Sequence, residues 1–262
     1  MRLLSLARDL RRRKARRRDA LFVAEGIRAV EELLSARAGA GLRVRGALAS
    51  PALDAGERGM ALRRALLDAG VPVLEVSDAD FASAADTDTP QGVLAIAEQP
   101  AHAVDAIVAA ARGRPLLLLD AIQDPGNAGT MLRAAAALGA AGVLAMPGTV
   151  DLWSAKVVRG AMGAIYQLPV AHVAWTELDA ARDDLPLWGA DAAGAPIARA
   201  ASDRPDRLGL VVGNEGNGLS VEARSRVDRL VAVPIVPAVE SLNAAVAAGI
   251  LLYELRPAAL RS

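Results

Sequence analysis

The sequence predicts an α/β protein, with a small N-terminal α/β domain and a larger C-terminal domain built on a parallel sheet. Two observations support this fold class. After position 115, short apolar runs typical of buried strands alternate with longer segments whose apolar residues recur at helical spacing. Before position 100, a shorter alternation of helix and strand patterns is present. The 262 residues are enough for two domains of ordinary size.

The first hundred residues show an alternation typical of a small α/β unit. The pattern predicts a basic helix, a helix over 21–37, a strand at 44–49, a helix at 58–69 and a strand at 71–76. A polar loop at 86–90 then leads through Gln91 and Gly92 into another apolar strand. Residues 101–114 are predicted to be a linker with a helical piece. We therefore expect domains over 1–100 and 115–262.

The second domain shows the rhythm of a parallel sheet. Strands are predicted at 115–120, 142–147, 187–190, 208–213 and 230–234, a turn and helix at 124–140, and further helices at 154–165 and 242–255. Ligands of open α/β sheets bind beyond the carboxyl ends of the strands. The loops that follow Leu119, Val212 and Val233 are therefore expected to converge on one site.

The composition excludes several kinds of chemistry. The chain has no cysteine, which rules out disulfides, a thiolate nucleophile, iron–sulfur clusters and Cys-ligated zinc. His102 and His172 stand far apart without metal-ligand spacing, so neither is assigned chemistry and no metal is expected. Aromatic residues make up 3% of the chain, so platforms for stacking bases are scarce. No signal peptide or membrane span is expected, and the predicted location is cytoplasmic.

Charge is distributed unevenly along a chain whose formal net charge is zero. Residues 11–18, RRRKARRR, hold seven basic side chains: Arg11, Arg12, Arg13, Lys14, Arg16, Arg17 and Arg18. Such a block is either a solvated arm or a binding surface for RNA phosphates, where each cation releases condensed counterions. A guanidinium matches a phosphate better than an ammonium does. We assign these residues to RNA binding.

The first of the three loops is DAIQDPGNAGTMLRAA at 120–135. Asn127 is suited to cap the helix that follows, since its amide oxygen can accept a backbone N–H. Arg133 lies in an otherwise Ala- and Leu-rich helix, where an aliphatic residue or a simple exposed charge would be ordinary. Capping does not account for it, so Arg133 is a candidate functional residue.

The second loop, VVGNEGNGLS at 211–220, is rich in glycine. Glycines let a backbone approach a ligand closely, and this turn alone would fit a phosphate cradle nearly as well. The G-x-x-x-x-G-K-[ST] and G-x-G-x-x-G patterns are both absent there. Glu215 would also place a negative charge where a pyrophosphate would lie. A carboxylate in this loop suits a cationic ligand or a helix cap better than an anion.

The third loop follows the strand VAVP and ends in ESLN at 240–243, before the last helix. Ser241 is a plausible N-cap, with its hydroxyl holding a backbone donor. Asn243, placed just inside the helix, has poor helix propensity and needs a partner. No loop decides the function by itself.

Together and in this order, DPGNAGTMLR, GNEGNGLS and VPIVPAVESLNAA resemble the signature motifs of the SpoU or TrmH family of RNA 2′-O-methyltransferases, part of the SPOUT superfamily. The resemblance extends over 115–256, including LWSAKVVRGAMGAIYQLPV at 152–170. The segments LFVAEGIRAVEELL and TDTPQGVLA resemble the small RNA-binding domain that precedes the methyltransferase in ribosomal RNA members. That domain is similar to a ribosomal protein fold.

The resemblance implies a SPOUT domain with a deep trefoil knot that binds S-adenosylmethionine. By the motif match, Gly213, Val233 and Leu242 would surround this cofactor, and the polar active-site set would be Asn127, Arg133, Glu215, Ser241 and Asn243. Pro237 departs from the pattern, because many members have Gly there. The family mechanism makes the first-motif Arg the base. Because a guanidinium gives up its proton only with difficulty, phosphate binding and stabilisation of charge at O2′ are favoured as the first role of Arg133, with proton removal second.

The resemblance also implies a homodimer, in which knot-side helices pack together. The function it implies is 2′-O-ribose methylation of RNA, with large-subunit ribosomal RNA as the expected substrate and transfer RNA as the alternative. A non-catalytic RNA-binding protein would account for the basic block, but not for three converging polar loops. A base-methylating SPOUT enzyme would share the knot, with an acidic general base and different motif spacing.

Overall fold

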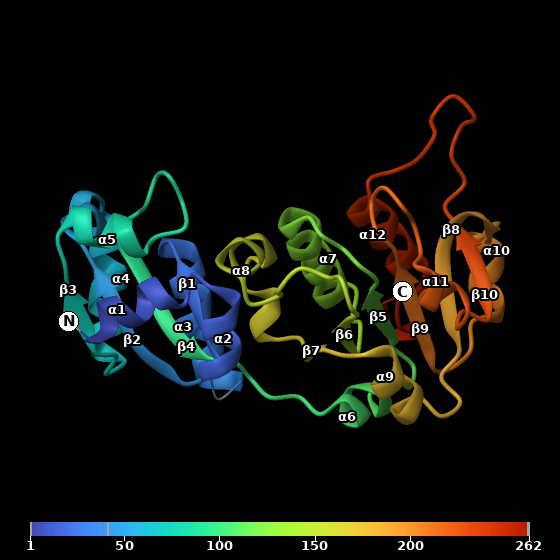
Figure 1. The fold of residues 1–262 in the computed structure, drawn as a ribbon, viewed down its shortest axis with the longest axis horizontal. Helices are drawn as coiled ribbons and strands as arrows, with labels where there is room; N and C mark the ends of the chain where they lie inside the picture. The colour runs from blue at the N-terminus through green and yellow to red at the C-terminus, as the bar shows by residue number, and fades with distance from the viewer. Residues whose placement is uncertain (1, 41, 261–262) are drawn as a thin grey trace. The chain divides into compact units, whose positions relative to one another are not determined.

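A computed structural model describes residues 2–40 and 42–260, which form two compact units (Figure 1). One unit consists of the chain up to Pro100 together with Asp151–Gln167. The other consists of Ala101–Val150 together with the residues from Leu168 onward. The N-terminal unit thus includes a segment that is distant from it in sequence.

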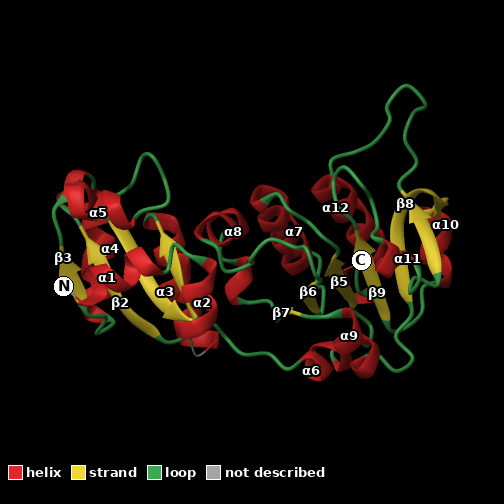
Figure 2. Ribbon diagram, in the orientation of Figure 1, coloured by secondary structure: helices red, strands yellow, loops and turns green. Residues whose placement is uncertain are grey.

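The N-terminal unit is built on a four-stranded mixed sheet in the order β1-β4-β2-β3 (Figure 2). Its strands are β1 (Leu21–Glu25), β2 (Val44–Ala49), β3 (Val73–Glu75) and β4 (Val93–Glu98). Strand β4 is antiparallel to both neighbours, and β2 and β3 are parallel. Its helices are α1 (Arg2–Asp9), α2 (Arg13–Asp19), α3 (Ile27–Ala40), α4 (Glu57–Asp68), α5 (Asp78–Ala84) and α8 (Ala155–Ala161), with 3-10 turns at Pro51–Ala55 and Ala164–Tyr166.

The predicted helix over 21–37 is wrong in its first part. Residues Leu21–Glu25 form β1, which pairs along its whole length with β4, and all five are buried. Gly26 has a φ of +95°, a conformation that L side chains rarely adopt, and it separates the strand from α3. Both faces of this strand are buried, so it lacks the alternation of apolar and polar residues that marks a half-exposed strand. A short apolar run of this kind fits a helix as well as a strand.

The segment Asp151–Gln167 completes the core of the N-terminal unit. The Phe22 ring is fully buried, with its centroid 4.7 Å from that of Trp153 and 5.8 Å from that of Tyr166. Burial raises the pKa of the Tyr166 hydroxyl above its ordinary range. The hydrophobic interior of this unit therefore depends on aromatic residues outside positions 1–100.

The second unit is a six-stranded sheet in the order β10-β8-β9-β5-β6-β7, and all of its strand pairs are parallel. The strands are β5 (Pro115–Leu119), β6 (Gly142–Ala145), β7 (Val170–His172), β8 (Leu187–Pro196), β9 (Leu208–Val212) and β10 (Arg229–Ala232). The helices are α6 (Val104–Ala109), α7 (Pro125–Ala137), α9 (Trp175–Ala181), α10 (Ile197–Ala200), α11 (Val221–Arg224) and α12 (Ala244–Leu255), with 3-10 turns at Ala201–Asp203 and Ala258–Leu260. The predicted parallel sheet is confirmed.

The position of β5 explains its composition. It lies inside the sheet between β9 and β6, and all five of its residues are buried. A strand covered on both faces reads as a continuous apolar run. The short edge strand β7 was not predicted, because three residues carry too little periodicity.

Candidate functional site at the carboxyl edge of the second sheet

Three side chains from three different loops form one hydrogen-bonded chain beyond the carboxyl edge of the second sheet. Asn243 Nδ2 donates to Asn127 Oδ1 at 3.0 Å, and Asn127 Nδ2 donates to Glu215 Oε1 at 2.8 Å. These residues follow β10, β5 and β9 respectively, and parallel strands bring their carboxyl ends to the same edge. The predicted convergence of the three loops is confirmed.

Asn127 is free to make this contact because another residue caps α7. The Asp124 side chain accepts the Asn127 backbone N–H at 2.7 Å, and Pro125 occupies the first helical position, where its missing N–H costs nothing. The predicted capping role of Asn127 is therefore wrong. Its amide lies in the first turn of α7 and points to the neighbouring loops.

The cap of α12 also differs from the prediction. Asn243 is the N-cap, and its Oδ1 accepts the backbone N–H groups of Ala245 and Val246 at 2.9 and 3.2 Å. The sequence placed Asn243 just inside the helix, where asparagine has poor propensity. As the N-cap it occupies a position that asparagine favours. Ser241 is exposed and does not cap the helix. Since Asn243 Nδ2 remains available, one side chain both starts α12 and links it to α7.

The glycine-rich loop closes on itself between Asn214 and Gly218, whose backbones exchange two hydrogen bonds of 2.9 Å. A Cβ at position 213 would lie 2.3 Å from the carbonyl of Gly218. Gly213 is thus required by the turn itself. Asn214 Oδ1 accepts the backbone N–H groups of Gly216 and Asn217, and its Nδ2 donates to the carbonyl of Ala121 at 2.9 Å.

Asp120 links the first loop to the second and was not predicted. This buried carboxylate accepts the backbone N–H of Ser220 at 2.7 Å and its hydroxyl at 3.0 Å. Burial raises the pKa of Asp120, and the two bonds from Ser220 oppose that shift. A charged residue directly after an apolar strand was the signal in the sequence that could have identified it.

A cavity of about 650 Å³ lies beside these loops. Gly213, Val233 and Leu242, the three residues predicted to surround a cofactor, all line it, as do Glu215 and Ser241. Residues of β8, β9, β10 and α12, most of them small or aliphatic, complete the wall, and the size suits a small-molecule ligand. The segment between β10 and α12 leaves the sheet as a long loop (Figure 1).

The charges of the cavity suit S-adenosylmethionine, a sulfonium cation. Asp191, Glu215 and Glu240 supply carboxylates to the wall, and Arg224 ion-pairs with Asp191. The backbone N–H of Ala193 and the Arg224 guanidinium lower the pKa of Asp191, which keeps it ionised. Carboxylates and apolar walls fit a cationic cofactor better than a polyphosphate.

Arg133 is separate from this hydrogen-bonded set. It is exposed on α7, six residues after Asn127, and has no hydrogen bond or ion pair within residues 2–40 and 42–260. A guanidinium presented to solvent without an internal partner is available to a phosphate. The structure therefore places Asn127, Glu215 and Asn243 in contact and leaves Arg133 exposed.

The basic block at 11–18 is folded into the N-terminal unit. Arg16 is buried, and its Nε lies 2.7 Å from Asp151 Oδ2, while its Nη1 donates to the carbonyls of Leu10 and Arg11. Its guanidinium cannot reach an external phosphate, so the assignment of Arg16 to RNA binding is corrected to a structural role. The cations that remain exposed are Arg11, Arg12, Arg13, Lys14, Arg17 and Arg18.

Some of these exposed cations are also partly neutralised. Arg18 pairs with both Asp9 and Asp19, and Arg12 pairs with Asp9.

Among the residues that the structure describes, no group of His, Asp and Glu could hold a metal ion. The same residues include no helix both long and apolar enough to span a membrane.

A parallel α/β sheet with a ligand cavity and converging polar loops at its carboxyl edge defines an α/β enzyme that binds a small molecule there. The model of the SpoU rRNA methylase family matches residues 114–253, and that of the MRM3-like substrate-binding domain matches residues 5–95. The chain belongs to the SpoU rRNA methylase family.

Relatives and solved structures agree with this membership. The chain is 34% identical to 23S rRNA (guanosine(2553)-2′-O)-methyltransferase RlmP of Bacillus subtilis, over 72% of this chain and 75% of that protein. It is 36% identical to 23S rRNA (guanosine-2′-O-)-methyltransferase RlmB of Ralstonia nicotianae, over 71% and 77%. The crystal structure of the SpoU methyltransferase AviRb from Streptomyces viridochromogenes with AdoMet has a TM-score of 0.81 and 27% identity, covering 97% and 96% of the chains.

Proposed function

We propose that this protein is an S-adenosylmethionine-dependent 2′-O-ribose methyltransferase that acts on ribosomal RNA. The observation that carries the proposal is the contact of Asn127, Glu215 and Asn243 beside a cavity lined by Gly213 and Leu242. These positions come from all three family motifs. The relatives named as ribosomal RNA 2′-O-methyltransferases support both the reaction and the class of substrate.

The cavity residues would hold S-adenosylmethionine, which supplies an electrophilic methyl group when bound. The remaining task of the protein is to bind the ribose, orient its 2′-hydroxyl and stabilise charge as the proton leaves. Asn127 and Asn243 offer amide groups for orienting the ribose and the loops. Glu215 fixes those loops by accepting hydrogen bonds, and Arg133 binds the phosphate of the target nucleotide.

The test is methyl transfer from labelled S-adenosylmethionine to protein-free ribosomal RNA by the full chain, followed by nuclease digestion and identification of the labelled nucleoside. We expect a 2′-O-methylnucleoside. Label on a base would refute ribose methylation, and cofactor binding without transfer to any ribosomal or transfer RNA would favour a non-catalytic RNA-binding protein.

We propose that the N-terminal unit selects the RNA and that the substrate is large-subunit ribosomal RNA. The match to an MRM3-like substrate-binding domain and the exposed cations of α2 support this role. Deletion of residues 1–100 is a poor test, because it would uncover Trp153 and Tyr166 and leave Asp151 without Arg16. A sharper test compares transfer to large-subunit, small-subunit and transfer RNA by the full chain, with large-subunit RNA expected to be preferred.

We also propose a homodimer formed through α12. Val246, Ile250 and Tyr253 are exposed large apolar residues at helical spacing on this helix. Ile250→Glu should convert the dimer to a monomer in light scattering, whereas the control Leu67→Glu, an exposed apolar residue on α4, should not. A wild-type monomer with full activity would contradict the proposal.

The trefoil knot, expected from the resemblance, and the cytoplasmic location, expected from the sequence, remain predictions.

A further inference from the structure

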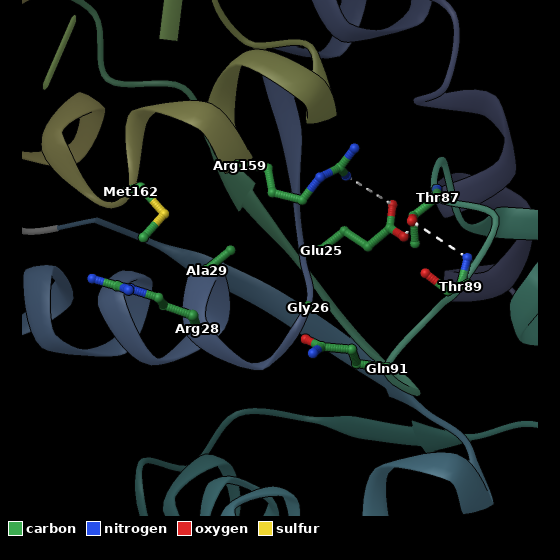
Figure 3. A pocket seen from close by; sticks show the side chains of 9 residues that line it. All are labelled: Glu25, Gly26, Arg28, Ala29, Thr87, Thr89, Gln91, Arg159 and Met162. Atoms are coloured by element: carbon green, nitrogen blue, oxygen red, sulfur yellow. Dashed lines mark hydrogen bonds and ion pairs between the residues drawn. The ribbon is translucent and has the colours of Figure 1, made fainter. Parts of the chain in front are cut away.

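A second cavity of the protein, of about 260 Å³, lies in the N-terminal unit, apart from the cavity proposed for the cofactor (Figure 3). Three parts of the chain line it: the turn from β1 to α3, the loop before β4, and α8 with the residue that follows it. Glu25 and Arg28 come from the first part, Thr89 from the second, and Arg159 and Met162 from the third. The motif segments at 21–34 and 87–95 meet here, although the proposed methylation site uses neither.

Glu25 fixes the walls of this cavity. Its side chain is 2% exposed, and its carboxylate accepts the backbone N–H groups of Asp86 and Thr87 at 2.7 and 3.2 Å. On the opposite side, Gln91 Oε1 accepts the backbone N–H of Ile27 at 3.0 Å. The loop is therefore tied to both ends of the turn between β1 and α3. A cavity held this way is preformed, which reduces the entropy lost when a ligand binds.

Arg159 has hydrogen-bonding capacity that the protein does not use. Its Nη1 lies 3.7 Å from Glu25 Oε2 and its Nη2 lies 3.7 Å from Asp86 Oδ2, distances that suit ion pairs but exceed hydrogen bonds. Nη1 is buried and has no hydrogen-bond partner among the described residues. A buried donor without an acceptor is costly, and the side chain as a whole is 37% exposed, which leaves part of it open to a ligand in the cavity.

The other lining groups indicate the chemistry of that ligand. Of the lining side chains that are charged at neutral pH, Arg28 and Arg159 are cationic and Glu25 is anionic, and Asp86 behind Arg159 is not part of the lining. Thr89 adds an exposed hydroxyl. Met162 and Ala29 supply apolar surface, on which a planar group can lie. Cationic donors beside an apolar wall suit a phosphate linked to a base.

We propose that this cavity binds one unpaired nucleotide of the RNA substrate, with Arg28 and Arg159 as phosphate donors and Met162 as the apolar wall for the base. RNA is read mainly at unpaired nucleotides, whose bases lie against aromatic, guanidinium or other flat surfaces. Aromatic residues are scarce in this chain, and a thioether beside a guanidinium replaces them here. The proposal rests on the proposed role of the N-terminal unit in RNA selection.

The experiment uses the full chain and two labelled RNA probes: a hairpin with a loop of unpaired nucleotides, and a fully paired duplex of the same stem. One variant is Arg159→Lys, which keeps the charge beside Glu25 but loses the planar donors. The other is the double variant Arg28→Ala with Thr89→Val, whose two positions are exposed. The matched control is Arg64→Ala, an exposed arginine on α4 that does not line the cavity.

We expect both cavity variants to bind the hairpin about tenfold more weakly than the control does, with duplex affinity equal to that of the control. In methyl transfer the KM for RNA should rise while kcat stays within about twofold. Hairpin binding equal to that of the control, or equal losses for hairpin and duplex, would overturn the proposal. If Arg159→Lys lowers the melting temperature, its loss of binding could come from unfolding, and the result for the double variant then tests the proposal. Absence of methylation by the wild-type chain would instead count against the proposed function.

Discussion

Arg16 and Asp151 form a buried ion pair across 135 positions of sequence, with Nε 2.7 Å from Oδ2 and both side chains less than a tenth exposed. The pair joins α2 to the start of the segment that completes the N-terminal unit. Arg16 also donates from Nη1 to two backbone carbonyls, so the guanidinium is well satisfied where it lies. Removal of either partner would take the opposite charge away from a buried ionic group.

The first prediction follows from this pair. Arg16→Ala should lower the free energy of unfolding by about 3–5 kcal/mol, as urea denaturation would measure, because it removes the guanidinium that pairs with the buried Asp151 carboxylate. Arg17→Ala, next in sequence but exposed, should change it by less than about 0.5 kcal/mol. Equal effects of the two substitutions would mean that Arg16 contributes only as a surface charge.

The second prediction concerns Arg133. Arg133→Ala should reduce methyl transfer by about a hundredfold or more, with cofactor affinity changed by no more than about threefold, since the residue is assigned to the substrate. Stability should be unchanged, because the side chain is exposed and has no partner in the described part of the chain. Arg199→Ala, an exposed arginine on α10, is the control. Near-normal turnover by the Arg133 variant would refute its assignment.

The third prediction tests the link between the loops. Glu215→Ala removes the acceptor for Asn127 and should lower kcat/KM by about tenfold or more, because the loops lose their mutual orientation. Glu215→Gln keeps an oxygen that can accept from the Asn127 amide and should retain most of the activity. If the Gln variant is as impaired as the Ala variant, the charge of Glu215 matters more than the hydrogen bond.

A fourth prediction concerns pH and Asp120. Its folded-state pKa is raised by burial, so the folded state holds this proton more tightly than the unfolded state does. The protonated Asp120 side chain therefore adds to the free energy of unfolding below the ordinary pKa of 3.8. This stabilisation is lost as the pH rises through the raised pKa of the folded state. Relative to Asp120→Asn, wild-type stability should fall over this window in urea titrations. A difference independent of pH would contradict the shift.

The motifs could be read from the sequence because they depend on local order, whereas the place of Asp151–Gln167 in the N-terminal unit could not. The buried strand β5, the turn of Asp124 and Pro125 and the glycine-rich loop each have a signature within a few residues, and parallel strands carry the loops that follow them to one edge. The class of the C-terminal site followed from that rule. Gly213, Val233 and Leu242 were predicted together from the resemblance of the motifs to the SpoU or TrmH family, and all three line the cavity.

Other features depended on contacts between residues that are distant in sequence. The choice of cap for α12 between Ser241 and Asn243, and the release of the Asn127 amide, required the positions of neighbouring loops. The basic block reads as seven equivalent cations, yet burial against Asp151 makes Arg16 structural. Sequence periodicity reports which side of an element is apolar, whereas only the tertiary structure decides which distant residue covers it.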